Sequence, residues 1–185
     1  MKRQKIAFDF DKVFVDYPPF IPSIIIDFLY KRKSGKLAYR YPGSVEKQIR
    51  ILSHHHFLRS PLKENIAALS KIHKNKDIET YIISSRYSFL KNKTNAWNKK
   101  YNISKYFSKM YFNYKDEQPH VFKEKILRSE SIDKFIDDDY DLLMYLSKRN
   151  PNISFYWITS SHPRRKLPSN VVKIKDVNEF ATSYV

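Results

Sequence analysis

Residues 6–16, which read IAFDFDKVFVD, constrain the fold of this chain more than any other stretch. The first three of them are apolar with no polar alternation, which is typical of a strand buried on both faces of a parallel sheet. Two carboxylates, Asp9 and Asp11, follow directly. Because ligands of open α/β sheets bind just outside the carboxyl ends of the strands, these two acids are candidates for a functional site.

Asp9 and Asp11 are separated by a single residue, Phe10. In an extended chain alternate side chains point to the same side, so the two carboxylates are expected to share one small volume. They would repel each other unless a cation lay between them. Oxygen ligands of this kind suit Mg²⁺ rather than zinc or copper. The alternative is a solvated turn at the end of a strand, and the two acids alone do not decide between them.

The composition limits the class of protein. A length of 185 residues predicts one domain with one sizeable core. The absence of cysteine excludes a disulfide framework and a thiolate metal site, and it is compatible with a cytoplasmic location. We expect no signal peptide and no membrane span, because no apolar run is long enough. The two glycines, Gly35 and Gly43, are too few for a glycine-rich phosphate loop.

The formal net charge of +16 suggests nucleic acid as a partner. A solvated, lysine-rich surface is the alternative, because the basic clusters are short and spread over the chain. The acids are less evenly distributed. Six of the 19 Asp and Glu residues lie in two short stretches that each follow an apolar run, namely Asp9, Asp11, Asp137, Asp138, Asp139 and Asp141.

Residues 17–60 interrupt the alternation of strands and helices and are predicted to form a small helical cap. Three prolines open the segment, and helices are expected at 24–30 and from Ser44, as N-cap, to about residue 56. The second of these places Val45, Ile49 and Leu52 on one face. Eight Lys and Arg against two acids make the cap positive and suited to an anionic substrate. The α/β core then comprises residues 1–16 and 61–185.

The run His54, His55 and His56 lies near the end of this predicted cap. Consecutive residues point to different sides of a helix, so the three imidazoles cannot hold one metal together without distortion. We therefore expect them to pack or to lie at the surface rather than to take part in chemistry.

From residue 61 onward, short apolar runs alternate with stretches of helical periodicity. This pattern indicates a parallel α/β sheet with helices on both faces, a Rossmann-like three-layer fold. Strands are expected at 80–83, at 110–112, before Asp137, at 153–157 and at 171–174. Helices are expected from Pro61, over 88–101, from Pro119 or His120, through 142–146, and from Asp176 as N-cap.

Three predicted strand ends thus carry polar side chains: Asp9 with Asp11, Ser84, and Asp137 with Asp138. Each has an alternative interpretation. A serine at a strand end often caps the next helix, and acids are favoured at helix N-termini. Their order along an alternating α/β pattern favours a common site.

With these motifs the chain resembles the haloacid dehalogenase-like (HAD) superfamily, most of whose members are Mg²⁺-dependent phosphohydrolases. The resemblance covers nearly the whole chain and rests on four motifs in order. They are the strand ending at Asp9 and Asp11, the strand YIIS ending at Ser84 and followed by Ser85 and Arg86, a helix lysine that is Lys123 with Lys125 as competitor, and the acidic pair Asp137 and Asp138. The Ser85-Arg86 pair resembles the T-A-R form of small nucleotidase-like members.

The resemblance implies a role for each acid. Asp9 would attack phosphorus and carry an aspartyl-phosphate. Asp11 would act as general acid and then as general base. Mg²⁺ would be held by the Asp9 carboxylate, the Asp11 backbone carbonyl and the pair Asp137 and Asp138.

The same resemblance implies a phosphate site. Ser84, with Ser85 and Arg86 beside it, would bind the phosphoryl oxygens, and Lys123 would offset negative charge. The chain departs from the family at Lys12, where the family often has glycine for a turn. Lys12 is hypothesised to add positive charge near the site.

The expected function is therefore a Mg²⁺-dependent phosphatase acting on a small phosphomonoester such as a nucleotide. Two alternatives stay open. One is a phosphatase acting on nucleic-acid ends, and the other is a non-catalytic basic module that binds nucleic acid on a HAD-like scaffold.

Overall fold

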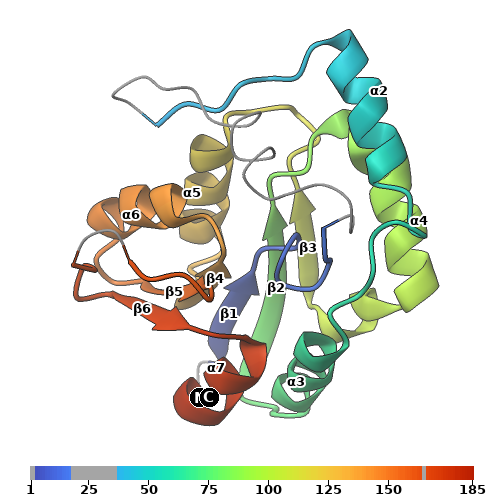
Figure 1. Cartoon of the computed structure of the whole chain (residues 1–185). Coiled ribbons are helices and arrows are strands. Elements are labelled where there is room, and N and C mark those ends of the chain that lie inside the picture. The colour runs from blue at the N-terminus through green and yellow to red at the C-terminus, as the bar shows by residue number, and fades with distance from the viewer. Residues whose placement is uncertain (1–2, 18–36, 164–165) are drawn as a thin grey trace.

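A six-stranded parallel sheet with the order β3-β2-β1-β4-β5-β6 forms the centre of the protein (Figure 1). The computed structural model describes residues 3–17, 37–163 and 166–185. The chain runs outward from β1 to β3 and then returns to the other side of β1 with β4. The switch point between β1 and β4 is where such sheets bind ligands. The strands are β1 (Gln4–Phe8), β2 (Ile78–Ser84), β3 (Lys109–Phe112), β4 (Lys134–Asp137), β5 (Ser154–Ile158) and β6 (Val171–Ile174).

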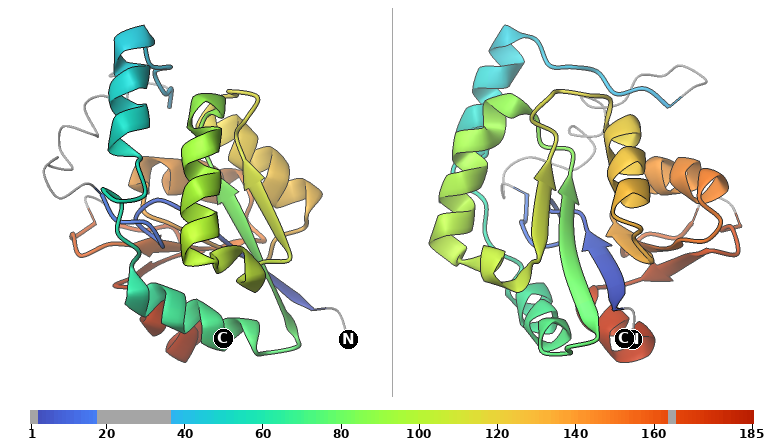
Figure 2. Two further views of the ribbon diagram at one scale, coloured as in Figure 1. Left: turned by 90° about the vertical axis from the view of Figure 1, so that its right-hand side faces the viewer. Right: turned by 180° about the vertical axis from the view of Figure 1, so that it is seen from behind.

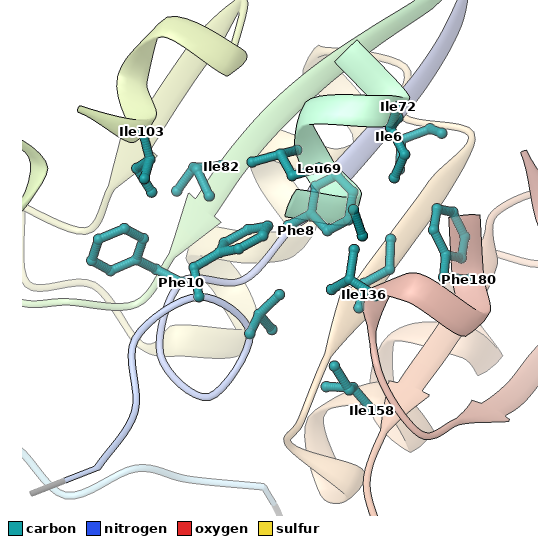
Figure 3. Close-up of a cluster of buried hydrophobic side chains, with 14 of the residues drawn as sticks. Ile6, Phe8, Phe10, Leu69, Ile72, Ile82, Ile103, Ile136, Ile158 and Phe180 are labelled. Atoms are coloured by element: carbon teal, nitrogen blue, oxygen red, sulfur yellow. The ribbon is translucent and has the colours of Figure 1, made fainter. Parts of the chain in front are cut away.

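One face of the sheet is covered by α3 (Lys63–His73), α4 (Lys91–Tyr101) and α7 (Val177–Tyr184). Alternate β1 residues point to this face, where Phe8 packs against Phe180 with ring centroids 6.1 Å apart (Figure 3). Leu69 of α3 and Trp97 of α4 complete the cluster and are fully buried.

The opposite face is covered by α5 (Pro119–Ser129) and α6 (Tyr140–Arg149) (Figure 2). Ala7 of β1 points to this side, where Phe135, Leu127 and Leu143 are fully buried. Helices on both faces of a parallel sheet make a three-layer α/β/α protein. The Rossmann-like fold predicted from the alternation of strands and helices is confirmed.

The strands, and most helices after residue 61, lie within two residues of the predicted positions. The starts of two helices in this region differ from the prediction. Pro61 does not open α3. It forms an antiparallel bridge with Val15, and the Leu62 N–H donates to the Phe14 carbonyl at 2.9 Å, so the chain stays extended until Lys63. The helix expected over 88–101 begins instead as a short 3₁₀ turn, η1 (Ser88–Leu90), before α4.

The helix of the insertion, α2 (Ser44–Ser53), starts one residue earlier than its predicted cap allows. Gly43 is the N-cap, because the Lys47 N–H already donates to the Gly43 carbonyl at 2.9 Å. The helix ends at Ser53 rather than near residue 56. The helix expected at 24–30 lies outside the described residues, and the boundary between core and insertion stays a prediction.

The apolar face expected on α2 is exposed. Val45, Ile49 and Leu52 are 75%, 57% and 68% exposed, whereas Arg50 is the buried residue of the helix. Its guanidinium contacts Glu46 on the same helix. In the part of the chain that the structure describes, the inner side of α2 is therefore polar rather than apolar.

Acidic side chains cap the last two α-helices. Asp176 is the N-cap of α7 and its Oδ1 accepts from the Glu179 N–H at 2.8 Å, which confirms that prediction. Asp139 caps α6 by accepting from the N–H groups of Asp141 and Leu142. The acids before Asp139 are not needed for the cap. Across the described segments, no helix has the length and apolar character needed to cross a membrane.

Two leucines test which helices depend on apolar packing. Leu69→Ala should lower the free energy of unfolding by about 2–5 kcal/mol, because it opens a cavity in the packed layer. Leu52→Ala removes the same atoms from an exposed position and should change it by less than about 0.5 kcal/mol. Urea denaturation measures both. A large loss for Leu52→Ala would mean that the α2 face is covered in solution.

Candidate active site

Three aspartates meet at the switch point of the sheet. Asp9 directly follows β1, and its N–H donates to the Ile136 carbonyl of β4 at 2.8 Å. Asp137 is the last residue of β4 and Asp138 follows it. Because β1 and β4 are parallel neighbours, their acidic ends lie at the same edge. Carboxylate oxygens of the three residues lie within 4.8 Å of one another.

The lysine at this cluster is Lys123 of α5. Its Nζ lies 2.6 Å from Asp9 Oδ1 and 2.6 Å from Asp137 Oδ2. Burial opposes its charge, but the two facing carboxylates outweigh burial and raise the pKa of Lys123 above its usual range. Lys125, the competing motif lysine, is exposed and binds Glu117. The two differ because side chains two residues apart on a helix point to different sides.

Negative charge exceeds positive charge in this cluster. Burial raises the pKa of Asp9 to about 7, opposed by Lys123 and reinforced by Asp137. Burial and neighbouring charges also raise the pKa values of Asp137 and Asp138. Three clustered carboxylates, all oxygen donors, fit a hard divalent cation such as Mg²⁺.

The Asp11 carboxylate is not one of the three that lie within 4.8 Å of one another, but it lines the same cleft and adds to burial and Asp137 in raising the pKa of Asp9. Its carboxylate accepts two hydrogen bonds from Arg86, Nε to Oδ2 at 2.8 Å and Nη2 to Oδ1 at 2.7 Å. Arg59 Nη1 lies 3.5 Å from Asp11 Oδ1. Burial alone would raise the pKa of Asp11, but the two arginines hold it well below its usual range. The cation beside Asp11 is a guanidinium, because the chain turns after Asp9.

The remaining predicted phosphate ligands lie around the same cleft. Ser84 ends β2 and is buried, and Ser85 follows it. The Ser85 Oγ is buried without a hydrogen-bond partner, so a donor is available there. Arg86 uses its donors on Asp11 and, through Nη1, on Thr94 Oγ1 at 3.1 Å. A direct contact from Arg86 to phosphate stays a prediction.

Lys12 adopts the left-handed backbone conformation that favours glycine, with φ of 59°. Its Nζ lies 3.5 Å from Asp138 Oδ2 and 4.4 Å from the centre of the Tyr17 ring. Lys12, which replaces the family's glycine, therefore has a strained backbone conformation. Its ammonium group lies at the acidic cluster, as hypothesised.

The three aspartates and Asp11 line a cleft of about 340 Å³ between the sheet edge and the insertion. Sequence reasoning did not identify the insertion residues in its wall, which are Tyr39, Arg50, His54 and Arg59. They lie far along the chain from Asp11, with no local signal. Tyr39 Oη donates to Asp139 Oδ2 at 2.7 Å and thus joins the insertion to the acidic edge.

His54 packs inside this wall, as expected for a packing residue, but it also faces the cleft. Arg59 Nη2 donates to His54 Nε2 at 3.0 Å, and His54 Nδ1 lies 2.7 Å from the Arg50 carbonyl. Burial and then the nearby arginines lower the pKa of His54 well below its usual value. A neutral imidazole that accepts at Nε2 therefore steadies Arg59 beside Asp11.

Comparison with known proteins supports the fold at low sequence identity. No protein-family model and no curated protein match the chain. An uncharacterized protein from Listeria monocytogenes serotype 4b is 12% identical with a TM-score of 0.55, covering 97% of this chain and 95% of that one. A HAD family enzyme from Bacteroides thetaiotaomicron, an aspartate-to-alanine mutant in complex with magnesium and inorganic phosphate, is 13% identical with a TM-score of 0.50, covering 88% and 96%.

A chain of the Pnkp1/Rnl/Hen1 RNA repair complex is also similar, with 12% identity and a TM-score of 0.53. The match covers 84% of this chain but only 42% of that longer one. At these identities the likeness shows the fold alone. The protein is an α/β Rossmann-like protein with HAD-like structural neighbours and an acidic cleft at its switch point.

The two-pronged contact from Arg86 to Asp11 yields a prediction. Arg86→Lys should lower the free energy of unfolding by about 1–3 kcal/mol, because a lysine cannot make both charge-assisted bonds. Arg3→Lys, at an exposed pair with Glu79, should change it by less than about 0.5 kcal/mol. Chemical denaturation of both variants is the measurement. Equal stability of Arg86→Lys and the wild type would show that the contact is not maintained.

Proposed function

We propose that this chain is a Mg²⁺-dependent phosphatase that hydrolyses a phosphomonoester through an aspartyl-phosphate on Asp9. The observation that carries the proposal is the cluster of Asp9, Asp137 and Asp138 around Lys123 at the switch point. The HAD family enzyme of similar fold, solved with magnesium and inorganic phosphate, supports it.

The covalent chemistry starts at Asp9. One of its carboxylate oxygens attacks phosphorus, the bond from phosphorus to the leaving oxygen breaks, and the leaving alcohol takes up a proton. Water then attacks phosphorus, the bond to Asp9 breaks, and inorganic phosphate and the free carboxylate are released. Lys123, in contact with Asp9, offsets the negative charge that would otherwise repel the substrate.

We assign the proton transfers to Asp11, two residues from the nucleophile. Asp11 gives its proton to the leaving alcohol in the first step. Ionised between Arg86 and Arg59, it then takes a proton from the attacking water in the second step, so that each cycle ends with Asp11 protonated again. Arg86 acts as a positioning residue in this scheme, because it fixes both carboxylate oxygens of Asp11.

Asp9, Asp137 and Asp138 would hold the cation, with the backbone carbonyl of Asp11 as a further oxygen. Bound Mg²⁺ would neutralise charge at the nucleophile and at the transferring group. The Ser84 and Ser85 hydroxyls line the cleft and are proposed to donate to phosphoryl oxygens, with Lys123 and Arg86 as the positive groups.

A small phosphomonoester such as a nucleotide fits a cleft of about 340 Å³. The second candidate substrate is a phosphorylated nucleic-acid end, which the net charge of +16 favours. The similar chain from an RNA repair complex also favours it. A non-catalytic basic binding module is the alternative to both.

Replacing the nucleophile tests the mechanism. Asp9→Asn should reduce hydrolysis of p-nitrophenyl phosphate with Mg²⁺ by roughly a thousandfold or more, because an amide cannot form the covalent intermediate. Asp77→Asn is the matched control, since Asp77 is exposed at the other end of the sheet, and it should retain wild-type turnover. Wild-type turnover by Asp9→Asn would exclude Asp9 as nucleophile. Failure of the folded, Mg²⁺-binding wild type to hydrolyse any phosphoester would favour the binding module.

The metal assignment has a separate readout. Calorimetric titration should show Mg²⁺ binding to the wild type and to Asp77→Asn, and about tenfold or more weaker binding to Asp138→Asn, which loses one charged ligand. Chelation should abolish turnover, and added Mg²⁺ should restore it. Undiminished binding by Asp138→Asn would place the cation elsewhere.

A further inference from the structure

Most of the net positive charge of the chain, +12 of +16, lies in two segments that contain no acid. Residues 47–63 and 80–115 include no Asp or Glu, although the chain has 19 such residues. The first segment covers most of α2 and the loop after it, and the second runs from β2 through α4 to the end of β3. The Lys and Arg residues of the two segments are Lys47, Arg50, Arg59, Lys63, Arg86, Lys91, Lys93, Lys99, Lys100, Lys105, Lys109 and Lys115.

These two segments meet in space on the same side of the molecule (Figure 1). Lys100 Nζ lies 4.3 Å from the centre of the Phe57 ring, and Tyr101 Oη donates to the His56 carbonyl at 3.4 Å. The loop after α2 is thereby joined to the end of α4. One ammonium group of the second segment, that of Lys100, therefore lies against an aromatic ring of the first.

The loop presents three stacked rings. The His55 and His56 centroids are 4.4 Å apart at 29°, and those of His55 and Phe57 are 5.3 Å apart at 28°. Phe57 is 74% exposed, an uncommon state for a phenyl ring. Burial, His55 and then Lys100 and Lys93 lower the pKa of His56, so both lysines lie near the rings, and Lys100 is in direct contact with Phe57.

This surface is continuous with the cleft. His54, which precedes the rings, and Arg59, which follows them, both line the cleft. The chain thus leaves the cleft wall, exposes the rings and returns to the wall within six residues. A polymer bound on the rings would have its end beside the acidic cluster.

Flat rings next to ammonium groups match the alternation of bases and phosphates in a single strand. Every base has a face that can stack on an aromatic ring, and phosphates follow a positive surface. A duplex hides its base faces, and a free nucleotide offers only one base for stacking. An anionic membrane would use the lysines but would gain nothing from stacked imidazoles.

We propose that this surface, the ring platform (His55, His56, Phe57, Lys93 and Lys100), binds a single strand of nucleic acid and directs its phosphorylated end into the cleft. The delivery of an end for hydrolysis rests on the proposed phosphatase function. The binding of the strand does not, so the two can be tested apart.

Binding is measured by fluorescence anisotropy on Asp9→Asn protein with Mg²⁺, using short labelled RNA and DNA strands with a 5′-phosphate, a 3′-phosphate or neither. Phe57→Ala in that background should raise the Kd about fivefold or more, the value of one lost stacking contact. Lys100→Ala should reduce the slope of log K against log salt by about 0.7. Val121→Ala and Lys148→Ala, at exposed positions on the α5 and α6 side, should leave Kd and slope unchanged.

Competition by other ligands and the chemistry of the strand end provide further tests of the ring platform. A duplex of the same sequence should compete weakly, and the preferred strand should be one that carries a terminal phosphate. Equal effects of Phe57→Ala and Val121→Ala would overturn the platform. Stronger binding to vesicles containing phosphatidylserine than to any strand would overturn it in favour of a membrane surface.

Turnover distinguishes this inference from the proposed function. Phosphate release from phosphorylated strands by the wild type, with a raised KM for Phe57→Ala on the strand, supports both. Release from p-nitrophenyl phosphate combined with no platform-dependent strand binding would overturn the platform and leave the phosphatase intact. Platform-dependent binding without release from any ester would overturn the phosphatase and leave the platform.

Discussion

The repulsion between carboxylates at the ends of two neighbouring parallel strands is the constraint on which the site depends. Asp9 and Asp137 are brought together by the pairing of β1 with β4, whose register the buried apolar residues maintain. Lys123, held by α5 on one face of the sheet, balances part of their charge. The remaining excess of negative charge makes the edge of the sheet suitable for a divalent cation and for nucleophilic carboxylate chemistry.

The second acid of the motif is placed by aromatic packing. Phe10 is fully buried, with its ring centroid 5.1 Å from that of Trp97 and 5.7 Å from that of Phe112. The Arg86 guanidinium lies 4.5 Å from the centre of the same ring. Anchoring Phe10 in the core therefore brings Asp11 to Arg86, and two neighbouring acids have pKa values shifted in opposite directions.

The positive charge expected of the insertion is used in two ways. Part of it is neutralised by acids, since Arg59 contacts Asp11 and Arg40 and Arg50 contact Glu46. Of these arginines, Arg50 and Arg59 are buried and line the cleft. On the solvent side, Lys47 of the insertion lies over the Tyr41 ring, and Phe57 of the insertion receives Lys100 of α4.

The amino-acid sequence by itself determined the order of strands and helices, because apolar runs and helical periodicity are local signals. The same signals locate the strand ends, and so the sequence placed Asp9, Ser84, Asp137 and Asp138 at the ends of strands. It could not choose between Lys123 and Lys125, since that choice depends on which face of α5 meets the sheet. Only the tertiary structure showed that Asp11 pairs with Arg86 and Arg59 and that the insertion lies in the cleft wall. Those contacts join residues far apart in the chain, and hydrophobic periodicity indicates only local structure.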